Sequence, residues 1–491
     1  MDAATMTQLR ERQQVRMRSH SPKPPQGWNR FKWYGPGLIW MISSVGSGSV
    51  LFTPRIGSRY EYGLLWMALI VIFLMWIMIR EVGWYTVVTG KTILEGYRDL
   101  PGPKNWAIWL IFLPQLVAAV VTVAGIAALT GSALMIAFPG NQALYATITI
   151  ILSLILVISG RYKVVELSTS IMAGVLVAVA IITAVRVFPP VEQLGGGIVP
   201  GLPEDLDFEF IIPWVGFILA GAAGIMWFSY WVAAREYGGP VEEDNNNHQP
   251  GNNGHSNREY LDEDYQQRLN SRLKKWIRIM STTAAIGVIG GGLVIVAFMI
   301  LGAELLAPEG IIPEGIQVAE DLTRLLSEVW GVFGYWLLII GVTIALAGTI
   351  LSNQDGWGRM FADATQILME PQLHQSQVEN GHNGNHLQQW IFSKLSNKEW
   401  LKNSYAIWVT AILPLIVFFL VRDPVDILSV GGVVTTVHTP VVVFLTLYLN
   451  RVQLPQALRP GWFSLIFMVL SGLFFTGFAI LYFLDLFGME F

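Results

Sequence analysis

Residues 35–55 read GPGLIWMISSVGSGSVLFTPR, and this stretch decides the fold class. It is apolar over about twenty residues, the length that crosses the hydrocarbon core of a bilayer. Near its middle, however, stands the polar and flexible sequence Gly46-Ser47-Gly48-Ser49. Glycine costs a helix about 1 kcal/mol per position, and serine offers the backbone competing hydrogen bonds. We therefore predict a transmembrane helix that is unwound at this interruption.

The remainder of the chain has the composition of a polytopic membrane protein. Of its 491 residues, 53% are hydrophobic and 13% are charged, and it contains no cysteine, which excludes disulfides and thiolate metal sites. The expected fold class is all-α, with about eleven transmembrane helices and the lipid bilayer as the partner. The expected spans lie near 35–54, 63–82, 105–136, 142–160, 165–186, 211–234, 279–302, 329–355, 403–421, 426–449 and 461–486.

The charges along the chain predict its orientation. If the N-terminus is cytoplasmic, almost all of the 31 Lys and Arg fall on the cytoplasmic side, as the positive-inside rule requires. An odd number of spans then places the C-terminus outside, and we expect a multi-pass protein of the plasma or inner membrane. The polar N-terminus has no apolar stretch typical of a cleavable signal peptide. The net charge of −4 is small and the basic residues lie in short clusters beside apolar stretches, so no nucleic-acid partner is expected. No cofactor is expected either.

The domain organisation follows from the spans. Residues 1–34 are expected to form a cytoplasmic tail, and residues 35–491 a transmembrane domain with a first repeat at 35–186, a second repeat at 211–449 and an extra helix at 461–486. The Asn-, Gly- and His-rich stretches at 237–270 and 371–399 are predicted to be disordered cytoplasmic inserts. They contain five histidines, for which a metal-sensing patch is the alternative to a plain linker: His248, His255, His374, His382 and His386.

A second interrupted span lies five spans after the first. Glycines and alanines at positions 216 and 221–224 weaken the helix expected at 211–234. In transporters built from inverted five-span repeats, corresponding broken helices meet at the midplane and bind the substrate. The predicted substrate site is therefore Gly46, Ser47, Gly48, Ser49, Gly224, Ile225, Met226 and Trp227. The alternative is that such small residues only let helices pack closely, the interpretation that we adopt for Gly287 and Gly290–Gly292 of the seventh span.

Four polar residues of the eighth and tenth spans form a candidate proton or polar pathway: Asn353, Gln354, Asp355 and His438. Ionisable groups within a membrane are functional candidates because burying them is costly. For His438 two interpretations stay open, a proton carrier and a bundle histidine whose hydrogen bonds are satisfied.

Several motifs resemble the Nramp (natural resistance-associated macrophage protein) family of divalent-metal transporters. They are GPG at 35–37, GSRYEYGLLW at 57–66, TGK at 89–91 and VVTTVHTP at 433–440, so the resemblance runs from about residue 31 to the end. It implies a LeuT-type fold, a 5+5 inverted repeat with broken helices 1 and 6. It also implies a transporter rather than an enzyme, which exchanges Mn²⁺ or Fe²⁺ with protons by alternating access.

The departures from the family pattern fall on the chemistry. The family's Asp-Pro-Gly-Asn of helix one is replaced by Gly46-Ser47-Gly48-Ser49, and its Met-Pro-His of helix six by Ile225-Met226-Trp227. The acidic residues of helix three, which in the family are associated with proton movement, match Thr122 and Gly125, and a glutamine of helix ten matches Gly432. The resemblance thus implies the fold, while the usual anionic, amide and imidazole ligands are missing.

The expected cargo follows from these losses. A dehydrated divalent ion without a carboxylate ligand carries a desolvation penalty of several kcal/mol per charge, whereas Mg²⁺ keeps several waters and accepts oxygen ligands. The candidate metal ligands are Ser47 and Ser49, with Met226 as the single soft ligand. Three alternatives are a non-metal solute or an anion held near Arg55 by helix N-termini, a non-transporting Nramp-like signalling protein, and an intramembrane enzyme, which the sequence favours least.

Overall fold

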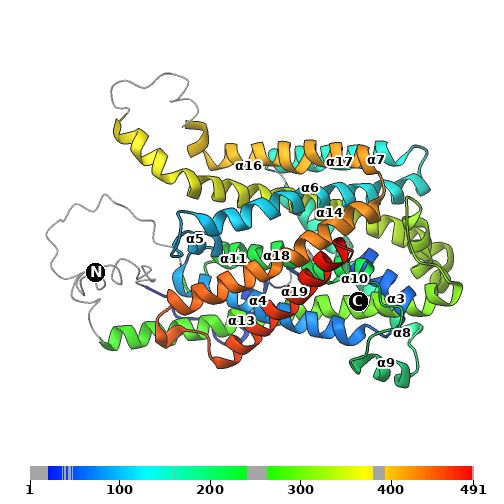
Figure 1. Ribbon diagram of the computed structural model, residues 1–491, viewed down its shortest axis with the longest axis horizontal. Helices are drawn as coiled ribbons and strands as arrows, with labels where there is room; N and C mark the ends of the chain where they lie inside the picture. The colour runs from blue at the N-terminus through cyan, green and yellow to red at the C-terminus, as the bar shows by residue number, and fades with distance from the viewer. Residues whose placement is uncertain are drawn as a thin grey trace.

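The computed structural model describes residues 20–35, 37, 40–41, 46, 48–160, 162–239, 263–379 and 393–488, of which 162–170, 220, 263 and 370–379 by backbone only. Within these residues every regular element is a helix, and the long helices run side by side along the long axis of the molecule (Figure 1). The predicted all-α fold class is confirmed.

Ten apolar helical segments follow the first span. Eight of them are long and apolar enough to cross a membrane by themselves, α7 is shorter, and α8 is followed by α9, Val191–Ile198, after a bend of 114°. Among the described residues eight helices, or nine if the bent pair is one span, are thus long and apolar enough to cross a membrane, and α7 and the interrupted first span match the other two expected positions. The segments are α4 Leu65–Thr89, α6 Trp106–Ala137, α7 Gln142–Ile158, α8 Tyr162–Arg186, α10 Phe208–Phe217 with α11 Gly221–Ala234, α13 Glu263–Leu301, α14 Val318–Glu379, α16 Lys398–Ile407 with α17 Leu413–Val421, α18 Pro424–Val452 and α19 Trp462–Leu486.

Short helices complete the connections. They are η1 Gly27–Trp33, α5 Ile93–Arg98, η5 Ala307–Glu309 and η7 Gln456–Leu458, together with the π-helical turns η4 Gly302–Leu306 and η6 Trp408–Ile412. The segment before the first span is tied to neighbouring helices: the Tyr237 hydroxyl donates to the Trp33 carbonyl oxygen. Burial raises the pKa of Tyr237 to about 12, so this hydroxyl keeps the proton that it donates at neutral pH.

The first span is interrupted where the sequence predicts. Residues 35, 37, 40 and 41 are helical, Gly46 is a bend, and the chain resumes as the π-helical turn η2, Gly48–Phe52, followed by α3, Thr53–Tyr60. Residues 42–45 and Ser47 lie outside the described residues.

The sixth span is interrupted within the stretch that the sequence marks as weak. α10 ends at Phe217, the short turn η3 spans Ile218–Ala220, and both Leu219 (φ 57°) and Gly221 (φ 52°) have left-handed backbone conformations. Gly224, Ile225, Met226 and Trp227, the predicted site residues of this span, lie in the regular helix α11 that follows the break. Gly221 takes up the unfavourable conformation, and the alanines that follow are strong helix formers, so the helix resumes at once.

The glycines of α13 serve close packing, as predicted for the seventh span. A Cβ at Gly287 would lie 2.6 Å from the Gly37 carbonyl oxygen, and a Cβ at Gly291 would overlap the side chain of Leu219. α13 therefore lies directly against the first span and against the break of the sixth.

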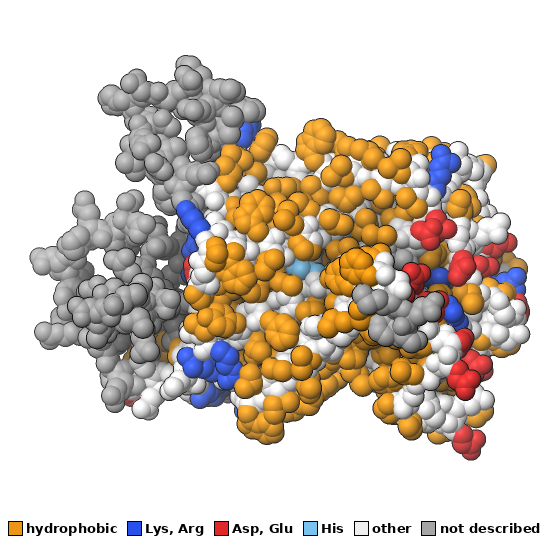
Figure 2. Space-filling view, viewed as in Figure 1, with side chains coloured by type: hydrophobic (Ala, Val, Ile, Leu, Met, Phe, Trp, Pro, Cys, Tyr) orange, Lys and Arg blue, Asp and Glu red, His pale blue; other side chains and the backbone are white. Residues whose placement is uncertain are grey.

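The two ends of the bundle carry opposite charge. Figure 2 shows a broad hydrophobic face between one end where Lys and Arg gather and an opposite end where Asp and Glu gather. The inserts predicted at 237–270 and 371–399 are shorter than expected, since α13 already begins at Glu263 and α14 continues to Glu379. His248, His255, His382 and His386 lie outside the described residues, and His374 lies in α14.

The closest helix contact near the breaks joins α10 and α18. A Cβ at Gly432 would lie 2.5 Å from the Pro213 carbonyl oxygen, and a Cβ at Gly216 would overlap the Gly432 carbonyl oxygen. The Thr436 hydroxyl donates to the Ile212 carbonyl oxygen across the same contact (2.9 Å). The first half of the sixth span is thereby held against the tenth.

This contact predicts a stability difference between two glycine variants. Gly432→Ala should lower the unfolding free energy by about 1–3 kcal/mol, because the added methyl forces α10 and α18 apart. Gly477→Ala in α19 is the control, since a Cβ there meets nothing within 4 Å. Thermal unfolding of the detergent-solubilised protein measures both, and equal melting temperatures would contradict the prediction.

Candidate functional site

The two broken spans meet at their breaks. A Cβ at Gly48 would overlap the Phe217 carbonyl oxygen, so the backbone of η2 lies directly against the end of α10. The Phe52 and Phe217 rings stack beside this contact with centroids 5.6 Å apart. The predicted meeting of the first and sixth spans is therefore present in the structure, and Gly48 is needed for it because any side chain would separate the two backbones.

The carbonyl groups at the breaks already have protein donors. The Thr53 hydroxyl donates to the Gly48 carbonyl oxygen (2.8 Å), the Trp40 indole N–H to that of Gly224 (3.1 Å), and the Val50 N–H to that of Gly46 (3.0 Å). Each carbonyl oxygen has a second lone pair. These carbonyl oxygens can therefore still accept a hydrogen bond from a bound water, but each already has one hydrogen-bond donor from the protein.

Span eight supplies the polar side chains next to the breaks. A Cβ at Gly46 would meet the Thr349 Cγ2 atom at 3.4 Å, so α14 lies beside the break of the first span. Asn353 follows Thr349 by four residues and lies on the same face of the helix. Three residues further, Gly356 packs against the Trp227 ring, 3.0 Å from a Cβ placed there. Asn353, which is 6% exposed, therefore lies between the Gly46 break and Trp227.

An aromatic pair and a hydrogen-bonded chain border this region. The rings of Trp227 and Trp357 meet edge to face with centroids 5.1 Å apart, and the Trp357 N–H donates to Gln115 Oε1 (3.0 Å). A tryptophan N–H can only donate, so it fixes the orientation of the Gln115 amide, whose Nε2 donates to His438 Nδ1 (3.0 Å). This chain requires a neutral His438 imidazole with its proton on Nε2.

The four residues of the predicted polar pathway point in different directions. Asn353 lies at the breaks, whereas Gln354 Nε2 donates to the Thr410 carbonyl oxygen (3.0 Å) on the far side of α14. Asp355 pairs with Lys402 and Arg359, each at 2.7 Å, and His438 bonds to Gln115. That these four residues form a proton or polar pathway stays a prediction, and the three that belong to α14 face about 100° apart from one to the next.

Sequence reasoning missed Thr349, Trp357 and Gln115. Helical spacing from Asn353 would have found the first two, since they lie four residues before and after it. Gln115 is a buried amide in the third span, and its polarity within an apolar run was the available signal.

The described residues contain no group of three or more His, Cys, Asp and Glu side chains that could hold a metal. Of the predicted metal ligands, Ser49 (1% exposed) is buried at the break and Met226 (1% exposed) is buried within α11, while Ser47 lies outside the described residues. The region where the spans meet thus offers neutral oxygens from hydroxyl, amide and backbone groups.

The cations and carboxylates near α3, at the end of the first span, are paired. Arg55 contacts Glu314 (3.2 Å), Arg59 contacts Asp207 (2.8 Å), and the Tyr62 hydroxyl donates to Glu304 (2.8 Å). Burial and this neighbouring carboxylate raise the pKa of Tyr62 well above its usual range. Arg55 therefore carries a compensated charge, and its guanidinium also lies over the Phe210 ring (4.5 Å).

Helix packing occupies the positions where the resemblance implies acidic and amide residues. A Cβ at Gly125 would overlap the Leu428 side chain, and a Cβ at Gly431 would lie 3.0 Å from the Thr122 hydroxyl oxygen. α6 and α18 are thus in close contact at the level of these residues. With Gly432 packed against Pro213, there is no room for a glutamate at 125 or a glutamine at 432.

Comparisons with known proteins agree with this geometry. The structure resembles the crystal structure of the Eremococcus coleocola manganese transporter bound to an aromatic bis-isothiourea compound, with a TM-score of 0.62 and 13% identity, covering 94% of this chain and 88% of that one. A mutant form of the same transporter gives the same values. This likeness shows the LeuT-type fold of two inverted five-helix repeats with broken helices 1 and 6.

An uncharacterized protein of Pasteurella multocida is 26% identical to this chain over 200 residues. The matched region covers 39% of this chain and 43% of the length of that curated relative. Residues 37–485, nearly the whole transmembrane part, match the natural resistance-associated macrophage protein-like family. This protein therefore belongs to the Nramp family.

Proposed function

We propose that this Nramp-family protein is a membrane transporter that carries a divalent metal cation, with part of its hydration shell, by alternating access. The observation that carries the proposal is the neutral lining where the two breaks meet: Ser49, Thr349 and Asn353 with backbone carbonyls, and no cluster of titratable ligands among the described residues. The metal class is supported by family membership and by the manganese transporters of the same fold.

The neutral lining favours a hard ion that keeps its water. Removing the water from a divalent ion without a carboxylate costs several kcal/mol per charge even after the protein relaxes. Mg²⁺ retains several waters in an octahedral shell, and hydroxyl and amide oxygens can accept hydrogen bonds from those waters. Transition ions gain most from thioether and imidazole ligands, which this site does not bring together. We therefore propose Mg²⁺ as the preferred cargo.

The alternative of an anionic solute has less support. It depended on Arg55 as a free cation near the end of the first span, and Arg55 is paired with Glu314. Transport of a non-metal solute by the same fold stays the second candidate function. Flux measurements over a panel of ions and amino acids would distinguish it from metal transport.

We also propose the orientation with a cytoplasmic N-terminus, which places the basic end of the bundle inside and the acidic end outside (Figure 2). In this orientation the undescribed parts of 237–270 and 371–399 belong to cytoplasmic connections, and Ser47 is proposed as part of the site.

Ligand substitutions test the selectivity. Asn353→Leu should lower Mg²⁺ flux into proteoliposomes by about tenfold, because one hydrogen bond to the hydrated ion is worth on the order of 1.5 kcal/mol. Met226→Leu, which removes the thioether and conserves volume, should change the flux by less than about twofold. Tight Mn²⁺ or Cd²⁺ binding that disappears in Met226→Leu would instead indicate that the protein transports transition metals.

A carboxylate restored at the first break should change the preferred ion. Gly46→Asp should raise Mn²⁺ affinity at least about tenfold, since a charge-assisted ligand replaces water, and Thr349 at 3.4 Å leaves space for a Cβ. Gly48→Asp is the matched control and should gain nothing, because its side chain would displace Phe217. Calorimetric titration measures both, and unchanged Mn²⁺ affinity in Gly46→Asp would argue against a cation site at this break.

Proton coupling should be weak. Positions 122 and 125 carry no titratable group and are closely packed, and His438 is bonded as a neutral imidazole. Mg²⁺ flux should therefore be the same with and without a pH gradient, and a pH-sensitive dye inside the liposomes should report no acidification during uptake. Acidification that persists in His438→Ala would show a proton route through other residues.

A further inference from the structure

A large pocket lies away from the breaks, between α6, α10, α18 and α19. Its volume is about 670 Å³, within the range of small-molecule sites. The walls are mainly apolar and come from all four helices, with Leu110, Pro213, Val434 and Phe483 as representatives. Several lining side chains are exposed on the hydrophobic face of the bundle, among them Val117 and Val430. The pocket therefore opens toward the lipid rather than toward water.

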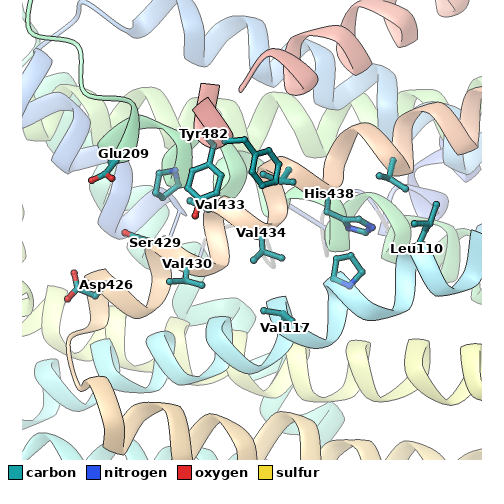
Figure 3. Close-up of a pocket in the computed structure, with 15 residues that line it drawn as sticks. Leu110, Val117, Glu209, Asp426, Ser429, Val430, Val433, Val434, His438 and Tyr482 are labelled. Carbon is teal, nitrogen blue, oxygen red and sulfur yellow. The ribbon is translucent and has the colours of Figure 1, made fainter. Parts of the chain in front are cut away.

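The pocket is polar at one end only. Figure 3 shows Glu209 and Asp426 at one end, at the starts of α10 and α18, and His438 at the other. His438 is 3% exposed and its Nδ1 atom is bonded to Gln115, so the inner end presents little polar surface. Twelve residues of α18 separate Asp426 from His438, about 18 Å at 1.5 Å per residue. This length is close to one leaflet of the hydrocarbon core, about 15 Å.

The two carboxylates lack a cationic partner. Within the described part of the chain, neither Glu209 nor Asp426 takes part in an ion pair, and the nearby Arg55 and Arg59 are engaged by Glu314 and Asp207. Asp423, whose carboxylate accepts the N–H groups of Val425 and Asp426, adds further negative charge. The mouth of an apolar, leaflet-long pocket thus carries two carboxylates that form no ion pair among the described residues.

We propose that this pocket binds one acyl chain of a phospholipid whose headgroup carries a protonated primary amine, as phosphatidylethanolamine does, with the ammonium at Glu209 and Asp426. The apolar walls take the chain, and the carboxylates accept N–H bonds that a quaternary choline headgroup cannot donate. Phosphatidylglycerol carries a net negative charge and is therefore disfavoured at the acidic mouth.

The position of the pocket gives the lipid a mechanical role. Glu209 and Pro213 belong to α10, the half-helix that ends at the break of the sixth span, and the remaining walls belong to its neighbours α6, α18 and α19. An acyl chain in the pocket contacts α10 together with these helices. It therefore favours the arrangement in which α10 lies against α18, and binding at this pocket does not require that the protein transport Mg²⁺.

Lipid retention tests the proposal directly. The purified protein is incorporated into nanodiscs that contain phosphatidylethanolamine, phosphatidylcholine and phosphatidylglycerol with identical chains, and native mass spectrometry counts the lipids that stay bound after release. Wild type should retain phosphatidylethanolamine about fivefold over phosphatidylcholine, as two partly exposed charge contacts allow, and more strongly over phosphatidylglycerol. The double variant Glu209→Gln/Asp426→Asn should lose this preference, whereas the control Glu204→Gln/Asp205→Asn, in the connection that precedes α10 and outside the pocket, should keep it.

A second pair of variants tests the acyl-chain site. Val434→Trp fills the pocket and should abolish retention of the bound lipid, while Leu152→Trp, on the exposed face of α7, should not. Equal retention of the three lipids by wild type, or a preference that survives in Glu209→Gln/Asp426→Asn, would overturn the proposal. Neither measurement uses transport, so failure of the proposed Mg²⁺ activity would leave these outcomes unchanged.

Discussion

The contact between the backbone at Gly48 and the carbonyl of Phe217 is the constraint on which the rest of the structure depends. Two interrupted helices can lie at the midplane of a membrane only if their freed backbone groups find partners within the protein. Here the Thr53 hydroxyl donates to the Gly48 carbonyl oxygen and accepts the Trp214 indole N–H (3.1 Å). A residue of the sixth span thus takes part in the hydrogen bonds at the break of the first. The glycines of α13 bring a third helix against the same place, and the remaining spans pack around this centre.

Much of this architecture could be predicted from the sequence because it follows from length, apolarity and glycine. The eleven spans, the break near Gly46 and the close packing of α13 all have local signals. The exact position of the break in the sixth span had no local signal. The residues from Gly221 to Gly224 indicate a weakened helix but not where the helix ends. Leu219 takes a left-handed conformation only because Gly291 leaves space for its side chain, and such a tertiary effect cannot be read from a single segment.

The site was harder to predict than the fold because it depends on the direction of each side chain and not only on the position of the residue in the sequence. Asn353, Gln354 and Asp355 are adjacent in sequence, yet each faces a different neighbour, and only the first lies beside the breaks. Likewise, the absence of an acidic residue at Gly125 is more than the loss of a group that could carry a proton. Leu428 fills the space that a carboxylate would need, so a single substitution at 125 would not restore the missing chemistry without moving α18.

α18 links the proposed substrate site to the pocket proposed to hold a lipid. One of its faces carries Gly431, Gly432 and Thr435, which pack against α6, α10 and the start of α11 at the breaks. Another carries Val430, Val434 and Val441, which line the pocket that opens to the lipid. A rigid helix cannot shift on one face alone, and α10 contacts both regions. Any movement of α10 that opens or closes the breaks must therefore change the shape of the pocket, and a lipid that prefers one shape must bias that movement by the difference in its affinity for the two states.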